Sequence, residues 1–245
     1  MTDMLSVTIQ DCSFRDPDGD GDTRLEAPIR LRNLSDNPVA LLLTRSWVRT
    51  PQGVVLCSNS EEREEPIAPG ESSEFEADSG WIRAQLLSGA DTAELSVDVL
   101  GCRSSFIRLP AVQLGEGQPG LYGSNQPLTP IPGIVLESLA ISVAPADEDG
   151  DVRVEVRLLV RNSRDAHLPR IALKVQAVAA NGRVLDDSST EDAIRPDELK
   201  LLETSFYSLK ENRLKGLEIR SEVTVFSIID SVTASLQVPI SMSLP

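Results

Sequence analysis

The chain has 245 residues, with 38 acidic against 23 basic side chains and a formal net charge of −15 at pH 7. This length allows one or two domains, and a hydrophobic share of 40% is typical of a globular protein rather than a disordered one. Because no cluster of Lys and Arg occurs in the sequence, we expect no direct binding of nucleic acid or of an anionic membrane surface.

The N-terminal segment, Met1–Leu5, has no basic region followed by an apolar run, and the longest apolar stretch, residues 39–43, is far shorter than a membrane span. We therefore expect neither a signal peptide nor a transmembrane segment, and a cytoplasmic or virion/particle-associated location. The three cysteines, Cys12, Cys57 and Cys102, fit a reducing compartment. Whether Cys57 and Cys102 pair is left open.

An acidic, glycine-containing segment follows the first predicted strand, Leu5–Gln10, and resembles the first half of an EF-hand-type calcium loop. Acids at alternate positions with a glycine after the third can bring several carboxylates around a hard cation. The twelfth position, where a Glu would complete the shell, is Ala27. Calcium binding and an ordinary acidic turn therefore both remain open. The candidate metal ligands are Asp16, Asp18, Asp20 and Asp22, with Asp147, Asp149 and Asp151 in the corresponding connection of the second half.

A repeat organises the chain at the offset that separates Asn33 from Asn162. Residues 24–33 (RLEAPIRLRN) align with 153–162 (RVEVRLLVRN), and the same offset relates Gly53 to Gly182. It slips by two where Pro-Gly-Glu at 69–71 aligns with Pro-Asp-Glu at 196–198. Because points so far apart in the chain share one offset, we infer an internal duplication.

Period-two alternation predicts strands in both copies. In the best aligned segment the aliphatic positions should face the core and the polar ones the solvent; these aliphatic residues are Leu25, Ala27, Ile29 and Leu31, and Val154, Val156, Leu158 and Val160. Further strands are expected at 39–50, 54–59, 72–77, 92–100 and 105–112, and at 135–144, 171–179, 183–187, 199–204, 217–225 and 231–238. Short strands of this number, separated by regular turns, are typical of a β-sandwich.

We therefore expect an all-β protein of two tandem immunoglobulin-like β-sandwich domains, residues 1–114 and 134–245, joined by a Pro/Gly-rich linker at 115–133. Each copy has a long strand, a Gly turn followed by Val-Leu, and Pro-Gly-Glu or Pro-Asp-Glu before another strand. This order resembles bacterial immunoglobulin-like and fibronectin-III-like domains, including the intracellular proteinase-inhibitor type. The resemblance implies this fold and a habit of binding other proteins, without a particular activity.

The strand that follows Asn33 aligns without gaps with the one that follows Asn162. In the second copy one face is apolar (Ile171, Leu173, Val175, Ala177) and the other reads Arg170, Ala172, Lys174, Gln176. The same register in the first copy turns Leu41, Leu43 and Trp47 outward, and an exposed apolar row with a Trp is typical of a contact site. The alternative is that Trp47 lies in the core, as a Trp on this strand does in immunoglobulin domains.

No catalytic motif accompanies these features. The single histidine, His167, lies in a predicted loop, and there is no nucleophile elbow, phosphate-binding loop or zinc-type Cys/His pairing. We expect no catalytic or cofactor-binding residues, no enzyme activity and no cofactor, with Ca²⁺ as the one alternative. The expected function is a non-enzymatic protein-interaction or assembly module, a structural or adaptor component of a larger bacterial or phage-type complex, with a protein partner or self-assembly. The alternatives are a calcium-dependent binding module that uses the acidic loops and a loop-mediated protease inhibitor.

Overall fold

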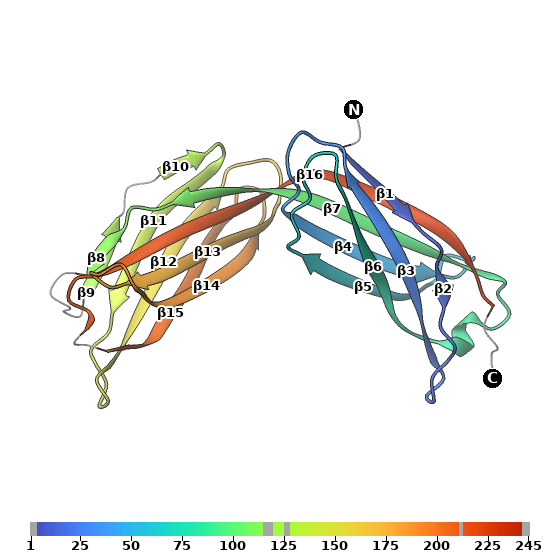
Figure 1. The fold of residues 1–245 in the computed structure, drawn as a ribbon, viewed down its shortest axis with the longest axis horizontal. Helices are drawn as coiled ribbons and strands as arrows, with labels where there is room; N and C mark the ends of the chain where they lie inside the picture. The colour runs from blue at the N-terminus through green and yellow to red at the C-terminus, as the bar shows by residue number, and fades with distance from the viewer. Residues whose placement is uncertain (1–3, 115–119, 125–127, 211–212, 242–245) are drawn as a thin grey trace. The chain divides into compact units, whose positions relative to one another are not determined.

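The computed structural model describes residues 4–114, 120–124, 128–210 and 213–241, and it is all-β (Figure 1). A short 3₁₀ helix, η1 (Ala84–Leu87), follows the sixth strand. None of the helices in these ranges is long and apolar enough to cross a membrane. In chain order the strands are β1 (Leu5–Ile9), β2 (Ser13–Phe14), β3 (Asp22–Asn33), β4 (Leu41–Arg49), β5 (Val55–Arg63), β6 (Ser72–Arg83), β7 (Thr92–Arg108), β8 (Val112–Leu114), β9 (Gly120–Ser124), β10 (Leu128–Ile131), β11 (Ile134–Val143), β12 (Asp151–Asn162), β13 (Leu168–Val178), β14 (Val184–Ile194), β15 (Leu199–Lys210) and β16 (Leu217–Pro239).

The chain forms two compact units, and the residue ranges of these units differ from those of the expected domains. Unit 1 contains Met1–Arg103 together with Ile228–Pro245, and unit 2 contains Ser104–Ser227. Strands β7 and β16 each contribute residues to both units, so each unit takes one strand from the other half of the sequence. The physical reason lies in residues 101–104 and 226–230: neither segment has a turn dipeptide, and the backbone continues as strand where we expected it to turn back.

In unit 1 the long strand β3 pairs with β6 along one side and with β1 and then β2 along the other. The second sheet has β4 between β5 and β7, with β16 beyond β7. Leu25, Ala27, Ile29 and Leu31 are fully buried in the core between these sheets, while Arg30 is exposed. The predicted alternation of this strand is confirmed.

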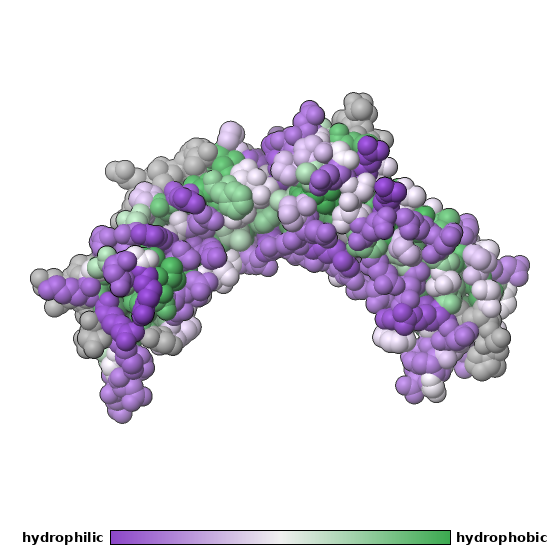
Figure 2. Space-filling view, viewed as in Figure 1, coloured by the Kyte–Doolittle hydropathy of each residue, from purple (hydrophilic) through white to green (hydrophobic). Residues whose placement is uncertain are grey.

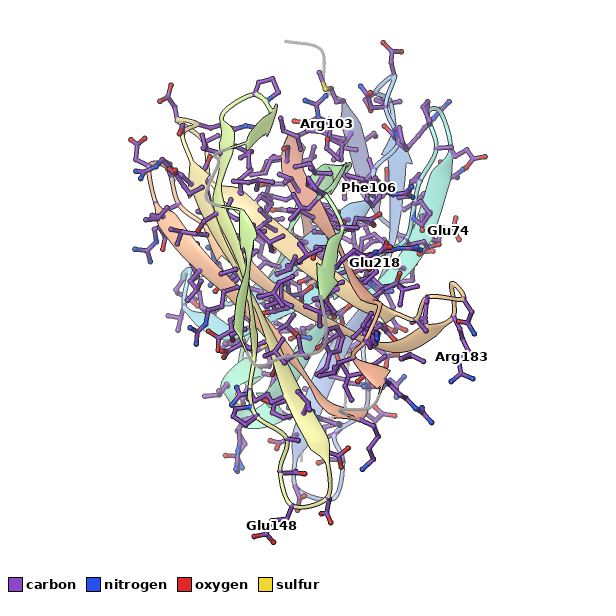
Figure 3. The ribbon with its side chains drawn as sticks, turned by 90° about the vertical axis from the view of Figure 1, so that its left-hand side faces the viewer. Glu74, Arg103, Phe106, Glu148, Arg183 and Glu218 are labelled. Carbon is purple, nitrogen blue, oxygen red and sulfur yellow. The ribbon has the colours of Figure 1, made fainter. Side chains whose placement is uncertain are left out.

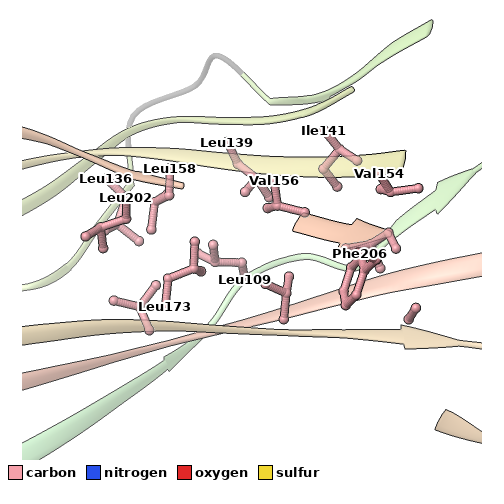
Figure 4. Packing of buried hydrophobic residues seen from close by; sticks show 14 of the residues in the cluster. Leu109, Leu136, Leu139, Ile141, Val154, Val156, Leu158, Leu173, Leu202 and Phe206 are labelled. Atoms are coloured by element: carbon pink, nitrogen blue, oxygen red, sulfur yellow. The ribbon is translucent and has the colours of Figure 1, made fainter. Parts of the chain in front are cut away.

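In unit 2 the equivalent strand β12 pairs with β11 and β15, and the second sheet has β13 between β14 and β16. The core contains Val154, Val156, Leu158 and Val160 as predicted. Leu109, from the segment that follows Ser104, lies in the same cluster as Leu173 and Phe206 (Figure 4).

The expected linker, 115–133, is in part a component of unit 2. Its strands β9 and β10 both pair with β11, antiparallel, and form the outer edge of that sheet. Residues 115–119 and 125–127 of the expected linker lie outside the described residues.

Each unit has a buried asparagine at the end of one strand, β3 in unit 1 and the equivalent β12 in unit 2. The amide nitrogen of Asn33 donates to the carbonyl oxygens of Asn37 at 2.8 Å and Ile67 at 3.0 Å, and that of Asn162 donates to Ala166 at 2.9 Å and Arg195 at 3.1 Å. Both asparagines are completely buried. Because a buried carbonyl group without a donor is costly, each asparagine ties a loop to the end of its strand.

Candidate protein interface

Strand β4 presents two faces of different character. Leu42 and Val48 belong to the core of unit 1, and the alternating residues Leu43, Arg45 and Trp47 lie on the opposite face. Trp47 stands between Ser58 of β5 and Ser96 of β7 in the sheet register. The register that we predicted by comparison with the second copy therefore describes this strand, and Trp47 is not part of the hydrophobic core cluster.

Two arginines flank Trp47 on the same face. The guanidinium carbons of Arg45 and Arg49 lie 5.9 Å and 5.1 Å from the centre of the indole ring. Contacts of this kind contribute about 0.5–1 kcal/mol at exposed sites. The indole ring is half-buried, and its Nε1 atom has no hydrogen-bond partner among the residues that the structure describes. The arginines thus hold the indole against the sheet without an ion pair of their own in the described part of the chain.

A shallow hollow of about 360 Å³ is lined by Arg45 and its neighbours on the same strand, Leu43 and Thr44. Leu43 of β4 and Leu100 of β7 are opposite each other in the register, and both contribute to the lining together with Arg45, Ser60 and Glu62. The hollow therefore combines a leucine pair with a polar rim, which is the usual anatomy of a protein contact site.

The predicted row is shorter than expected, because Leu41 is not accessible. Leu41 is fully buried and lies opposite Cys102, which is fully buried too, whereas Leu43 and Trp47 are half-buried. The comparison of faces placed Arg45 on this side of the strand without assigning it to the contact, and it missed Arg49 and Leu100. Arg49 could have been found, since it alternates with Trp47 in the period-two pattern, but Leu100 joins the site only through strand pairing.

The matching face of unit 2 is charged. Lys174 and Gln176 of β13 lie opposite Glu222 and Arg220 of β16. They line a hollow of about 540 Å³, where Glu222 accepts from Arg108 at 3.3 Å and Glu218 pairs with Arg220 at 2.5 Å. Gln176 therefore stands in unit 2 where unit 1 has Trp47, and Ala172 stands where unit 1 has Leu43.

The candidate calcium ligands form hairpin tips in both units. Asp18 Oδ1 accepts from the backbone N–H groups of Asp20 and Asp22, both at 2.9 Å. Asp147 Oδ1 accepts from the equivalent groups of Asp149 at 3.0 Å and Asp151 at 2.8 Å. Gly21 and Gly150 take the left-handed conformation, with φ of 78° and 74°, which glycine adopts without steric cost.

These acids are not brought together around a common point. Among the described residues, no group of three or more His, Cys, Asp or Glu side chains could hold a metal ion. Asp22 instead lies 3.4 Å from Arg83, and Asp151 lies 2.9 Å from Lys210. Both tips are hydrophilic in the space-filling view (Figure 2), and Glu148 points away from the ribbon at the end of its hairpin (Figure 3). The structure thus does not assemble the predicted ligands Asp16, Asp18, Asp20 and Asp22, or Asp147, Asp149 and Asp151, into a calcium site.

The cysteines are free thiols. Cys57 lies opposite Val48, a core residue, and Cys102 lies opposite Leu41, which is on the other face of β4. The two side chains therefore leave the sheet on opposite sides and do not form a disulfide. Desolvation by burial raises the pKa of Cys102 to about 12, and it raises the pKa of Cys57 as well, so both thiols remain protonated at neutral pH.

No protein-family model and no curated protein matches the chain. Among solved structures, the chain is similar to red sea bream transglutaminase at 10% identity, covering 99% of this chain but only 32% of the other, with a TM-score of 0.26. A protein from Archaeoglobus fulgidus matches at 12% identity over 39% of this chain and 82% of its own (TM-score 0.25), and pT26-6p at 8% over 97% and 66% (TM-score 0.25). Likenesses this remote carry no argument about fold or function.

Proposed function

We propose that the protein is a non-enzymatic protein-interaction or assembly module, built from two immunoglobulin-like sandwiches that arose by duplication. The repeated buried asparagines, Asn33 and Asn162, and the repeated hairpin tips support the duplication. Three unpaired thiols agree with a reducing location such as the cytoplasm or the interior of a particle. The module acts as a structural or adaptor component of a larger complex.

The observation that carries this proposal is the outer face of unit 1, formed by Leu43, Arg45, Trp47, Arg49 and Leu100. Trp and Arg are the side chains most enriched among residues that dominate binding energy. A partner that covers Trp47 and the leucine pair removes apolar area from water, at about 25 cal/mol per Å². The alternatives, calcium-dependent binding and protease inhibition, gain no comparable observation, because the acids of the tips serve as turn formers.

The test uses the aligned positions of the two units. The full chain serves as bait in an extract of its natural source, beside Trp47→Ala and the matched control Gln176→Ala, and self-association is followed by sedimentation. We expect a partner, or self-association, that Trp47→Ala weakens at least tenfold, the scale of a residue that dominates binding, while Gln176→Ala leaves it unchanged.

Trp47→Ala should leave thermal unfolding nearly unchanged, since the indole lies outside the core cluster. If Trp47→Ala unfolds the protein, Trp47 has a core role and the proposal fails. It fails too if both variants retain every association of the natural chain.

A further inference from the structure

The edge formed by β1 and β2 in unit 1 has an equivalent in unit 2. Val7 and Ile9 of β1 lie opposite Leu31 and Ile29 of β3. Leu136 and Leu139 of β11 lie opposite Val160 and Leu158 of β12, which are the aligned positions of the repeat. Strands β1 and β2 together thus occupy the place that β11 fills as one continuous strand.

The two edges differ in what covers them. In unit 2, β10 lies beside Leu136 and β9 beside Leu139, and these side chains are only 3% and 7% exposed. In the described part of unit 1, no strand pairs with β1 on the side away from β3. Val7 and Ile9 are correspondingly half-buried, although their positions in the ladder are the same.

On the side away from β3, the backbone of β1 has N–H and C=O groups that can bond to a further strand. Leu34 donates to the carbonyl of Met4, and Gln10 donates to the carbonyl of Pro28, so the even-numbered residues of β1 bond to β3. In an antiparallel ladder the odd-numbered residues, Val7 and Ile9, then direct their N–H and C=O groups outward. Among hydrogen bonds within the described residues, an outward amide of β1 is occupied only at the start of the strand, where Leu5 donates to the Asp230 carboxylate at 3.0 Å.

The break between β1 and β2 follows from Pro28. Proline has no N–H group, so Pro28 accepts from Gln10 but returns no hydrogen bond, and β1 ends at Ile9. The aligned residue of unit 2, Arg157, has an N–H group, and β11 is continuous there.

Proteins usually protect exposed sheet edges with charged side chains, and β1 lacks them. Its sequence, LSVTI, is uncharged, as is that of β2. Four other edge strands carry acids, with Glu62 in β5, Glu74 in β6, Asp187 in β14 and Glu203 in β15, whereas the short edge strands β8, β9 and β10 carry no charge. The β1 edge therefore combines outward backbone groups and half-buried aliphatic residues with a strand that has no charged side chain of its own.

We propose that the β1 edge of unit 1 binds an extended segment of another protein, which adds to the sheet as an antiparallel strand in the way that β9 and β10 add to β11. The segment has apolar residues at alternate positions, to cover Val7 and Ile9, and uncharged polar residues opposite Ser6 and Thr8. A second copy of this chain suits the edge less well, because two β1 strands paired antiparallel around Val7 would set Ile9 opposite Leu5, whose N–H already donates to the Asp230 carboxylate.

The probe is a synthetic peptide with the sequence of Gly120–Ile131, titrated to millimolar concentration into the full chain. Amide exchange and chemical shifts of Val7 and Ile9 are the readout. We expect slower exchange at these two amides. Val7→Pro should abolish the effect, because it removes an outward N–H group and leaves the bonds of the even-numbered residues to β3 intact. The control Val7→Thr keeps the N–H group and should retain binding.

A covalent graft of the same segment tests the proposal even if the free peptide binds weakly. A copy of Gly120–Gly133 replaces Met1–Met4, so that its Pro-Gly turn precedes Leu5 as the original precedes Ile134. Tethering raises the local concentration to millimolar values, and we expect at least about tenfold slower exchange at Val7 and Ile9, lost again in Val7→Pro.

If neither the peptide nor the graft slows exchange at Val7 and Ile9, the edge is closed to strands and the proposal is wrong. If the natural chain alone dimerises and Val7→Pro abolishes the dimer, the occupant is a second copy, and the assignment to another protein is wrong. Trp47→Ala should change neither result, so this proposal and the function proposed for the outer face of β4 can fail separately.

Discussion

Strand β4 of unit 1 and strand β13 of unit 2 hold the same place in their sheets but turn different faces outward. Their inner residues are alike: Leu42 and Ile171 are both buried in their cores. Their outer residues differ, with Trp47 between two arginines in one unit and Gln176 opposite Arg220 in the other. Burial restricts the inner positions to apolar side chains of suitable size, whereas the outer positions are free to differ between the two units.

The largest expected effect tests whether the two cores are equivalent. Ile29→Ala in unit 1 and Leu158→Ala in unit 2 should each lower the free energy of unfolding by about 2–5 kcal/mol, measured by urea denaturation. The exposed neighbour Arg30 provides the control, since Arg30→Ala should change it by less than about 0.5 kcal/mol. A large effect in one unit and none in the other would show that the aligned strands are not equivalent.

A smaller loss of stability is expected at Gly101, where the packing of unit 1 differs from that of unit 2. Gly101 lies opposite Leu42, and Val225 lies opposite Ile171. A Cβ atom at Gly101 would meet Cδ1 of Leu5 at 2.6 Å, so the Leu5 side chain occupies the space that a side chain at Gly101 would need. Gly101→Ala should therefore destabilise the protein by about 1–3 kcal/mol in urea denaturation.

The double variant Leu5→Ala, Gly101→Ala sharpens this prediction. Because the shortened residue 5 makes room for the added methyl group, the combined loss of stability should be smaller than the sum of the two single losses. Strict additivity would mean that Gly101 is constrained by something other than Leu5.

The loop before β6 and the loop before β15 differ at one backbone position. Gly70 has φ of 79°, and its counterpart Asp197, whose N–H donates to Asn162 as that of Gly70 does to Asn33, has φ of 57°. Left-handed backbone is costly for residues with a Cβ atom. We expect Asp197→Gly to raise the free energy of unfolding by up to about 1 kcal/mol, and with it the melting temperature. Gly70→Asp should lower the free energy of unfolding by a similar amount. The opposite signs would mean that the Asp197 side chain stabilises its loop.

The smallest expected effect concerns the two hairpin tips. Because Asp18 and Asp147 direct their carboxylates to backbone N–H groups, millimolar Ca²⁺ should leave the melting temperature unchanged. Specific binding would instead add about 2.7 kcal/mol at a hundredfold excess over the dissociation constant. A rise with Ca²⁺ that Asp18→Asn removes would restore the calcium hypothesis for unit 1.

Much of the fold could be predicted where the burial or backbone conformation of a residue depends only on its neighbours in the chain. Alternation placed Ile29 and Leu158 in the cores, and the turn glycines Gly53, Gly70 and Gly182 all have positive φ. The candidate site was predictable in part. The register of Trp47 followed from comparing the two copies, but the burial of Leu41 and the contribution of Leu100 did not, because both depend on strand β7.

The amino-acid sequence by itself determined the all-β class and the sides of β3, β4, β12 and β13 that face the cores, because the pleat of a strand converts alternate residues into opposite faces. Only the tertiary structure decided which strand completes which unit, that Asp18 and Asp147 close turns, and that β9 and β10 cover one of two equivalent edges. These outcomes depend on pairing between segments far apart in the chain. Such pairing is made by backbone hydrogen bonds, which are nearly the same for most side chains, so the sequence alone does not indicate which strands pair.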